Sequence, residues 1–574
     1  MAETEFEPAE GDAIPITPSG GADWKDRLRQ GRTGVARFTI DNPVLVKEFR
    51  TRMRGTRAYW ILLIYTLLLA GVLAMMYFSY EATVAQQTGT LAAGPSTGAQ
   101  DLGRSIYYFV FIAQALMVAL ITPAITAGTL TIEREQRSYE LLVTTPLRPA
   151  DLVRGKLAAA VAFVLLLLTA SLPLVSMSFL VGGVSPAEIF FSYVIIGCSA
   201  FVYGAVGIFW SATLRTTAAA TVVTYLTVLS LFILTSVPGM IGASAAISGG
   251  KPDVGIPFQS VNPISATFRA LQPEYFFAVQ FPSWVSSVIL NLLLGLVISV
   301  GAMGRLEHFD PPAPGWLRGL STLLWCSFVS FLFGAVIGGA SPNWNAANFR
   351  EPTGWILIWM LVLVALVTPV LNTGDLVLRR GESALGRYLT GLLPHRALAN
   401  DLSSGFPLVL AWGVFLFALL PIGLQSTGKL SLVPIVGMLM PGLILSAVVY
   451  SALAGVGNLL SVTLPSRWAA CVLTYLFGVV TMLLPYFTLF PWFQTNRPRT
   501  LQLWHQVLYL VPFEGLNQLI APDTYLAERP PLLLGAAVPV WLITSILYAV
   551  IAVACFALTA GFVARAGRRL EAQP

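Results

Sequence analysis

Long, almost uninterrupted runs of apolar residues limit what this chain can fold into. Each run is long enough for a helix to cross about 30 Å of hydrocarbon. A transmembrane β-barrel would instead show short segments of alternating polarity. We therefore expect an all-α polytopic membrane protein with about 12 transmembrane helices, near residues 59–80, 106–128, 157–180, 187–213, 217–238, 283–304, 319–340, 354–374, 406–424, 434–463, 469–489 and 536–561.

Composition agrees with this class. Of the 574 residues, 56% are hydrophobic and only 11% are charged, whereas soluble domains carry about 25% charged residues. The net charge of +6 is interpreted as basic residues gathered on cytoplasmic loops. We therefore expect the lipid bilayer as a partner and no nucleic acid.

The distribution of lysine and arginine predicts the topology. With the N-terminus inside and twelve alternating spans, about three quarters of the 34 basic residues fall on the inner side. Basic residues favour cytoplasmic loops. This bias predicts a multi-pass protein of the plasma (cytoplasmic) membrane, with both termini in the cytoplasm.

The chain divides into four predicted regions. Residues 1–23 are acidic and rich in Pro and Gly, which predicts a disordered tail. Residues 24–58 mix arginines with apolar residues and are expected to form an amphipathic connecting helix at the inner membrane surface. Residues 59–310 and 313–574 then supply six spans each.

The two sets of six spans resemble each other, which indicates an internal duplication. Gly207, Ser211 and Thr224 match Gly457, Ser461 and Thr474, all at an offset of 250 residues. Thr122-Pro123 matches Thr368-Pro369 at an offset of 246. Because each set has an even number of spans, both have the same orientation, and we expect two parallel repeats related by an axis along the membrane normal.

The densest charge cluster between closely spaced spans lies at residues 132–156. On one helix, Glu133, Arg137 and Glu140 would form a polar stripe at i, i+4 and i+7, opposite an apolar face. Prolines 146 and 149 would end that helix. This pattern predicts a short amphipathic helix over about 132–145 at the inner surface. Periodicity alone leaves an ordinary solvated loop helix equally open.

The run TPAITAGTLTIEREQRSYELLVTTPLRPADLVRGK (122–156) resembles the permeases of type-2 ABC exporters, the ABC-2 family. In that family a Pro-containing second helix leads into an acidic helix, followed by a break and a Gly-Lys entry to the third helix. The run NPVLVKEFRTRMRGTRAYW (42–60) is similar to the family's connecting helix. The resemblance implies a fused, double-length permease that forms the export pathway for an unknown substrate.

The resemblance also implies a partner. In this family the acidic helix docks on a separate nucleotide-binding ATPase. The resemblance implies two copies of that ATPase, which would bind ATP and magnesium. No phosphate-binding loop motif occurs in this chain, so we expect a transport subunit that is not itself an enzyme and holds no cofactor. The implied ATPase-coupling residues are Glu133, Arg134, Glu135, Arg137 and Glu140.

The second half departs from the pattern in its key helix. The run LVLRRGESALGRYLTGLLPHRA (376–397) lacks the paired acids, and Gly381 and Gly386 are expected to weaken a helix there. The residues implied for a second coupling helix are Arg379, Arg380, Glu382 and Arg387. Transmission of force is therefore expected to be weaker in this half.

Two other functions remain as alternatives. An ion-coupled secondary transporter could share twelve spans and two parallel repeats, but the span interiors hold Gln114, Asn291 and Asn458 and no clear acid or base. A membrane-embedded protease would need a second aspartate beside Gly374-Asp375. The cysteines and histidines show no metal-ligand spacing. We also expect short external helices within 239–282 and 490–535, where prolines and aromatic residues cluster.

Overall fold

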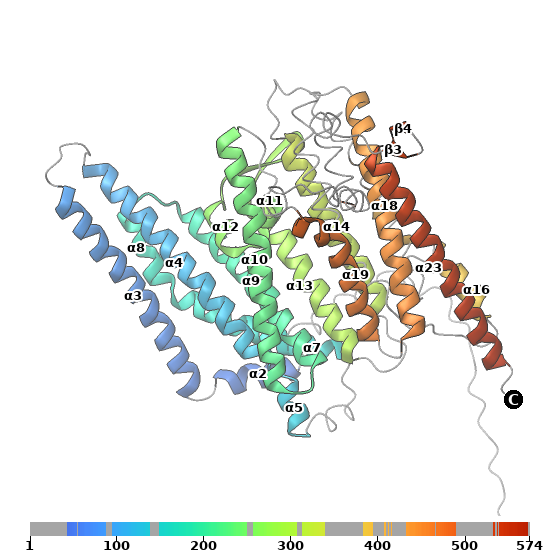
Figure 1. Cartoon of the computed structure of the whole chain (residues 1–574). Coiled ribbons are helices and arrows are strands. Elements are labelled where there is room, and N and C mark those ends of the chain that lie inside the picture. Colours follow the sequence, from blue (N-terminus) through green and yellow to red (C-terminus); the bar gives the residue numbers. More distant parts are fainter. Residues whose placement is uncertain are drawn as a thin grey trace, which may run out of the picture.

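The protein is described here by a computed structural model (Figure 1). It describes residues 43–53, 56–87, 95–137, 149–249, 256–306, 313–338, 383–393, 432–464, 467–488, 532–533, 536–537 and 539–571, with a few single positions between 407 and 419 and at 512. Nearly all of the described residues are helical, which confirms the all-α polytopic class. Nine described helices are long and apolar enough to cross a membrane.

The first set begins with α2 (Pro43–Met53), which lies across the end of the bundle and packs on α7 (Figure 1). Of the predicted connecting helix over 24–58, the structure describes α2 and the first three residues of the spanning helix α3. The spanning helices of this set are α3 (Thr56–Gln87), α4 (Pro95–Thr126), α7 (Pro149–Ala170), α9 (Pro186–Thr213), α10 (Thr217–Gly249) and α13 (Trp284–Leu306).

Five of these helices, all but α13, bury residues in one large apolar core, and α3 covers its edge. Tyr65 and Leu69 of α3 are buried in that core, together with Val110 of α4, Phe163 of α7 and Tyr203 of α9. The opposite face of α3 exposes large apolar side chains along its length, as a lipid-facing helix does: Trp60, Ile64, Leu67, Met75 and Phe78.

The third span differs from the prediction of one helix over 157–180. It starts earlier, at Pro149, and is broken at Ser171 before α8 (Leu172–Val181). Pro173 lies at the start of α8, and a proline inside a continuous helix would remove a hydrogen bond and clash with the preceding turn. Ser171 and its neighbour Tyr193 also bind Gln114, one of the polar residues noted inside the spans, at 2.8 and 3.3 Å.

The segment between the fifth and sixth spans is more ordered than a loop. It contains the expected short helices, α11 (Ile256–Val261) and α12 (Pro263–Phe268), and also a hairpin that was not predicted, β1 (Pro273–Phe276) and β2 (Val279–Pro282). The strands are antiparallel, with Pro273 opposite Pro282. The corresponding prediction for 490–535 lies almost entirely outside the described residues.

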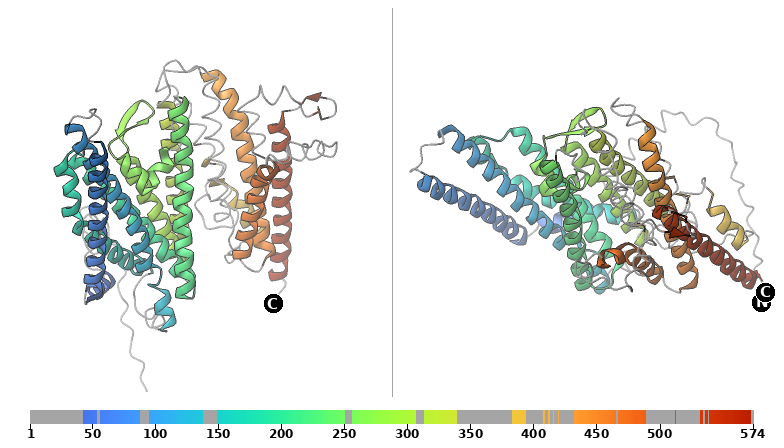
Figure 2. Two further views of the ribbon diagram at one scale, coloured as in Figure 1. Left: turned by 60° about the vertical axis from the view of Figure 1, so that its left-hand side comes forward. Right: turned by 45° about the horizontal axis from the view of Figure 1, so that its top comes forward.

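The second set is described in part. Its helices are α14 (Ala313–Gly338), α16 (Ala384–Gly391), α18 (Leu432–Thr463), α19 (Arg467–Thr488) and α23 (Val540–Glu571), with a two-stranded hairpin of β3 (Leu532–Leu533) and β4 (Ala536–Ala537). The predicted spans 354–374 and, for the most part, 406–424 lie outside the described residues, so the count of twelve stays a prediction. The views in Figure 2 agree that α18 and α23 run side by side, and they form an extensive helix pair.

Two helix pairs have matching ends in the two sets. α9 ends at Thr213 and α18 at Thr463, while α10 begins at Thr217 and α19 at Arg467. Both matches have the offset of 250 residues found in the sequence. α9 packs on the sixth helix of its own set, α13, just as α18 packs on α23.

Candidate functional site

The acidic segment after α4 forms a much shorter helix than predicted. α5 covers only Thr131–Glu135, and Arg137 has a positive φ of 57°. A residue in the left-handed region ends a helix, so Glu133 and Arg137 do not share the predicted stripe. Glu140 lies outside the described residues.

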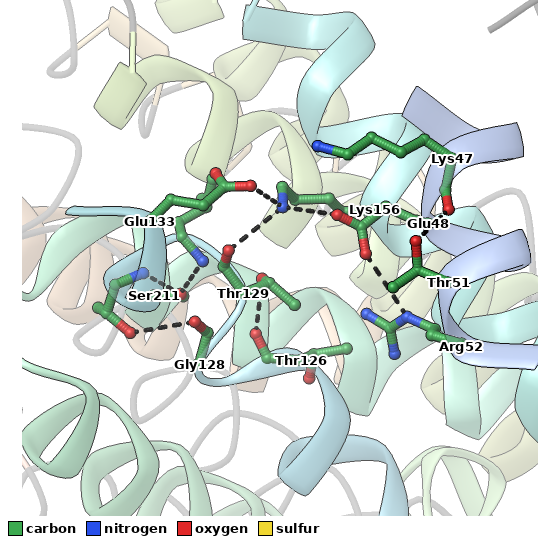
Figure 3. Close-up of polar contacts among 12 residues, drawn as sticks. Lys47, Glu48, Thr51, Arg52, Thr126, Gly128, Thr129, Glu133, Lys156 and Ser211 are labelled. Atoms are coloured by element: carbon green, nitrogen blue, oxygen red, sulfur yellow. Dashed lines mark hydrogen bonds and ion pairs between the residues drawn. The ribbon is translucent and has the colours of Figure 1, made fainter. Parts of the chain in front are cut away.

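Lys156 lies at the centre of a charged network beside α5 (Figure 3). Its side chain, only 2% exposed, comes from the second turn of α7. Its Nζ atom donates to Glu133 Oε1 at 2.8 Å and to Glu48 Oε1 of α2 at 3.0 Å. It also donates to the Thr129 carbonyl at 3.2 Å. We call Lys156, Glu48 and Glu133 the Lys156 network.

A buried ammonium group of this kind is stable only when it is paired. The two carboxylates provide more than the compensating charge, and Arg52 adds a second cation, with its Nε atom 3.7 Å from Glu48 Oε2. Burial lowers the pKa of the Arg52 guanidinium, and the charge of Glu48 opposes that shift. The network therefore joins α2, α5 and α7 through alternating charges.

The other two charges of α5 hold the junction between α9 and α10. Arg134 donates to the Leu214 and Ala212 carbonyls, at 3.0 and 2.9 Å. These carbonyls lie at the end of α9, where helical partners are lacking and where a positive charge is favourable. Glu135 accepts hydrogen bonds from the amide and the hydroxyl of Thr217, at 2.7 and 2.9 Å. Its negative charge therefore lies at the start of α10.

Ser211 holds the start of α5 itself. α5 has no side-chain cap of its own. Instead Ser211 Oγ on α9 accepts from the amides of Leu130 and Thr131, at 2.9 and 3.2 Å. This contact needs α9 and α4 to approach closely. Gly207 permits it, because a Cβ atom there would lie 2.0 Å from Thr126 Oγ1.

The corresponding segment of the second set forms a helix in spite of its glycines. α16 begins at Ala384, and Ser383 Oγ caps it by accepting from the amide of Gly386 at 3.1 Å. Tyr388 is buried beside Val563 of α23. Burial raises the pKa of Tyr388 to about 12, so the phenol stays neutral at physiological pH. Of the four charged residues predicted here, only Arg387 lies in α16, and Arg379, Arg380 and Glu382 lie outside the described residues.

A family model described as ABC-2 family transporter protein matches residues 43–376. The chain belongs to the ABC-2 transporter family. The match begins at the first residue of α2 and includes the whole Lys156 network. It continues past the predicted boundary between the two halves and ends before α16, so it does not itself divide the chain into repeats. A search among curated proteins finds no match.

In this ABC-2 protein the structure brings three of the five predicted coupling residues together. Glu133, Arg134 and Glu135 all contact neighbouring helices, while Arg137 is exposed in the turn that follows. Lys156 and Glu48 also belong to the site, but the sequence did not identify them as site residues. The available signals were a lysine at the entry to an apolar span and a glutamate among arginines, because a buried cation needs an acidic partner.

Proposed function

We propose that this membrane transport protein is the permease of an ATP-driven exporter, powered by a separate ATPase that binds ATP and magnesium. The observation that supports this proposal is the position of α5. Through Glu133, Arg134 and Glu135 it is bonded, directly or through Lys156, to α2, α7, α9 and α10. A displacement of α5 by a docked ATPase would therefore reach four helices at once.

The charges of α5 divide into two roles under this proposal. Glu133, Arg134 and Glu135 are engaged inside the permease, so they transmit force and do not dock. Docking falls to the exposed turn after α5, with Gln136 and Arg137, and to Glu140 beyond it. Charged residues at the rim of an interface guide and orient a partner. Arg137 is thus the described residue best suited to meet an acidic patch on the ATPase.

The test separates docking from transmission. The permease is purified from membranes with its ATPase, and both co-purification and permease-stimulated ATP turnover are measured. Arg137→Glu is expected to reduce co-purification, because it places an acid against an acidic patch. Glu81→Lys is the control, since it reverses an exposed charge at the other end of α3.

Transmission is tested by neutralising the network as a whole. The triple variant Glu48→Gln, Glu133→Gln and Lys156→Gln removes the buried ammonium together with both of its carboxylates. Arg52 alone loses an acidic partner, and the glutamine amide oxygen at position 48 can still accept from it, so the fold is expected to persist. We expect it to retain the ATPase and lose most of the stimulated turnover. Full stimulation in a normally inserted triple variant would refute the role assigned to α5.

We further propose that the chain is a fused pseudo-dimer in the plasma membrane, with cytoplasmic termini and repeats at 59–310 and 313–574. The matching ends of α9 with α18 and of α10 with α19 support this. A second ATPase would then dock near α16 and Arg387. The mass of the detergent-solubilised complex decides the matter: two ATPase copies per permease chain are expected, and a single copy would contradict the proposal.

A further inference from the structure

A cavity of about 270 Å³ lies at the end of the bundle opposite to α5. It is formed near the starts of α4 and α9 and by the segment that joins α12 to β1. Both α4 and α9 run from this cavity toward the Lys156 network, so the two sites are separated by the length of the helices. The lining residues are Arg104, Tyr107, Tyr108, Val184, Glu188, Thr267, Phe268, Ala270, Leu271, Gln272 and Pro273.

The cavity carries charges of both signs that do not neutralise each other. Arg104 is exposed, and its guanidinium forms no ion pair or hydrogen bond with any other described residue. Glu188 uses one carboxylate oxygen, Oε2, to accept from the Ser185 amide at 2.8 Å, as part of a capping box at the start of α9. Its other oxygen, Oε1, keeps its hydrogen-bonding capacity.

Three aromatic residues form part of the remaining wall, and the hydroxyl of one of them, Tyr107, already has partners. Tyr107 has its hydroxyl hydrogen-bonded to Ser192 Oγ at 2.7 Å and to the Thr267 carbonyl at 3.2 Å. The rings of Tyr108 and Phe268 meet edge to face, with centroids 4.7 Å apart. Aromatic rings attract an ammonium group through their negative faces. These rings therefore add a surface suited to a cation.

We propose that this cavity binds a small zwitterionic group, with its phosphate or carboxylate on Arg104 and its ammonium on Glu188 and the aromatic wall. A simple anion would leave the charge of the Glu188 carboxylate uncompensated. A simple cation would leave the charge of the Arg104 guanidinium uncompensated. The volume of about 270 Å³ lies just below the range of about 300–1,000 Å³ for ligand pockets, which suits a headgroup rather than a whole lipid. The group belongs to a free metabolite or to an amphipathic lipid, which share this chemistry.

The test is calorimetric titration of the full-length purified protein with two probes, soluble phosphoethanolamine and lyso-phosphatidylethanolamine. Arg104→Gln and Glu188→Gln are each expected to weaken binding at least tenfold, which corresponds to about 1.4 kcal/mol. Glutamine can replace glutamate in a capping box, so Glu188→Gln removes the charge and keeps the start of α9. Arg565→Gln, an exposed arginine on α23, is the matched control and should bind as the wild type does.

The anionic probe lyso-phosphatidylglycerol sharpens the assignment. Arg104→Gln should weaken its binding, whereas Glu188→Gln should leave it equal or tighter, because a repelling carboxylate is removed. Binding of both ethanolamine probes indicates recognition of the headgroup alone, and binding of the lyso-lipid only indicates a lipid source. Failure of the wild type to bind both ethanolamine probes, or binding of these probes by both cavity variants with the affinity of the wild type, would overturn the proposal. No ATPase is used, so the outcome is independent of the proposed coupling.

Discussion

α5 and α16 occupy corresponding places in the two halves, yet they are stabilised in opposite ways. α5 has no local cap and depends on Ser211 of α9, on Lys156 of α7 and on the junction that Arg134 and Glu135 hold. α16 is capped by its own neighbour, Ser383. Ser461 matches Ser211 at the offset of 250 residues. Its buried hydroxyl oxygen in α18 has no hydrogen-bond partner among the described residues.

This difference shows that matching helix ends do not require matching contacts. The described contacts tie α5 to four other helices, which are expected to move with it, whereas α16 has a cap of its own. α16 still packs on α23 through Tyr388. The comparison therefore predicts that the first half carries most of the mechanical coupling. Substitutions of single residues can test this prediction.

The largest effect is expected at Lys156. Lys156→Met leaves Glu48 and Glu133 partly buried without their cation, and the loss of one partner of such a group costs about 3 kcal/mol. Unfolding in mixed micelles would measure the change in the free energy of unfolding. The triple neutral variant serves as the control and should recover most of the loss. A single-variant cost below about 1 kcal/mol would show that water already compensates these carboxylates.

Arg134→Ala is expected to have the next largest effect. It removes two charge-assisted hydrogen bonds to carbonyls at the end of α9, worth about 2 kcal/mol together. Arg137→Ala is the matched control, because Arg137 is exposed in the next turn and should change stability by less than about 0.5 kcal/mol. The same unfolding assay compares them. Equal costs would mean that the α9 junction does not depend on α5.

The paired variants Ser211→Ala and Ser461→Ala test the asymmetry itself. Ser211→Ala deprives the Leu130 and Thr131 amides of their acceptor, which costs about 1–2 kcal/mol when such groups are buried. Ser461→Ala should change the free energy of unfolding by less than about 0.5 kcal/mol. A large cost at Ser461 would show that a segment outside the described residues caps itself there, and that the halves are alike after all.

The sequence predicted the spans of the first half well because apolar length is a strong, local signal. The start of α10 at Thr217 and the end of α9 at Thr213 agree with the predicted ranges, and they repeat at the predicted offset. The break at Ser171 was missed, although Pro173 is the residue type that causes one. The β1–β2 hairpin was also missed, since its few residues show no clear alternation.

The candidate site was predicted in composition but not in geometry. Periodicity treats Glu133 and Arg137 as neighbours on one helix, while the chain turns at Arg137 and directs Glu133 toward Lys156. That choice depends on Lys156 and Ser211, which are 23 and 78 residues away from Glu133 in the chain. A local pattern carries no information about such partners. Ion pairs across helices become visible only when the packing is known.

The smallest expected effect is on the cap of α16, and it completes the comparison. Ser383→Ala removes the acceptor of the Gly386 amide, and loss of such a cap costs about 1 kcal/mol. Because the cap is local, we expect faster amide hydrogen exchange within 384–391 and unchanged exchange within 131–135. Ser383→Asp keeps an acceptor at the cap position and is the control. If Ser383→Ala instead lowered the protection of α5 as well, the two helices would be coupled through the bundle, and α16 would have to be counted as part of the same mechanical unit.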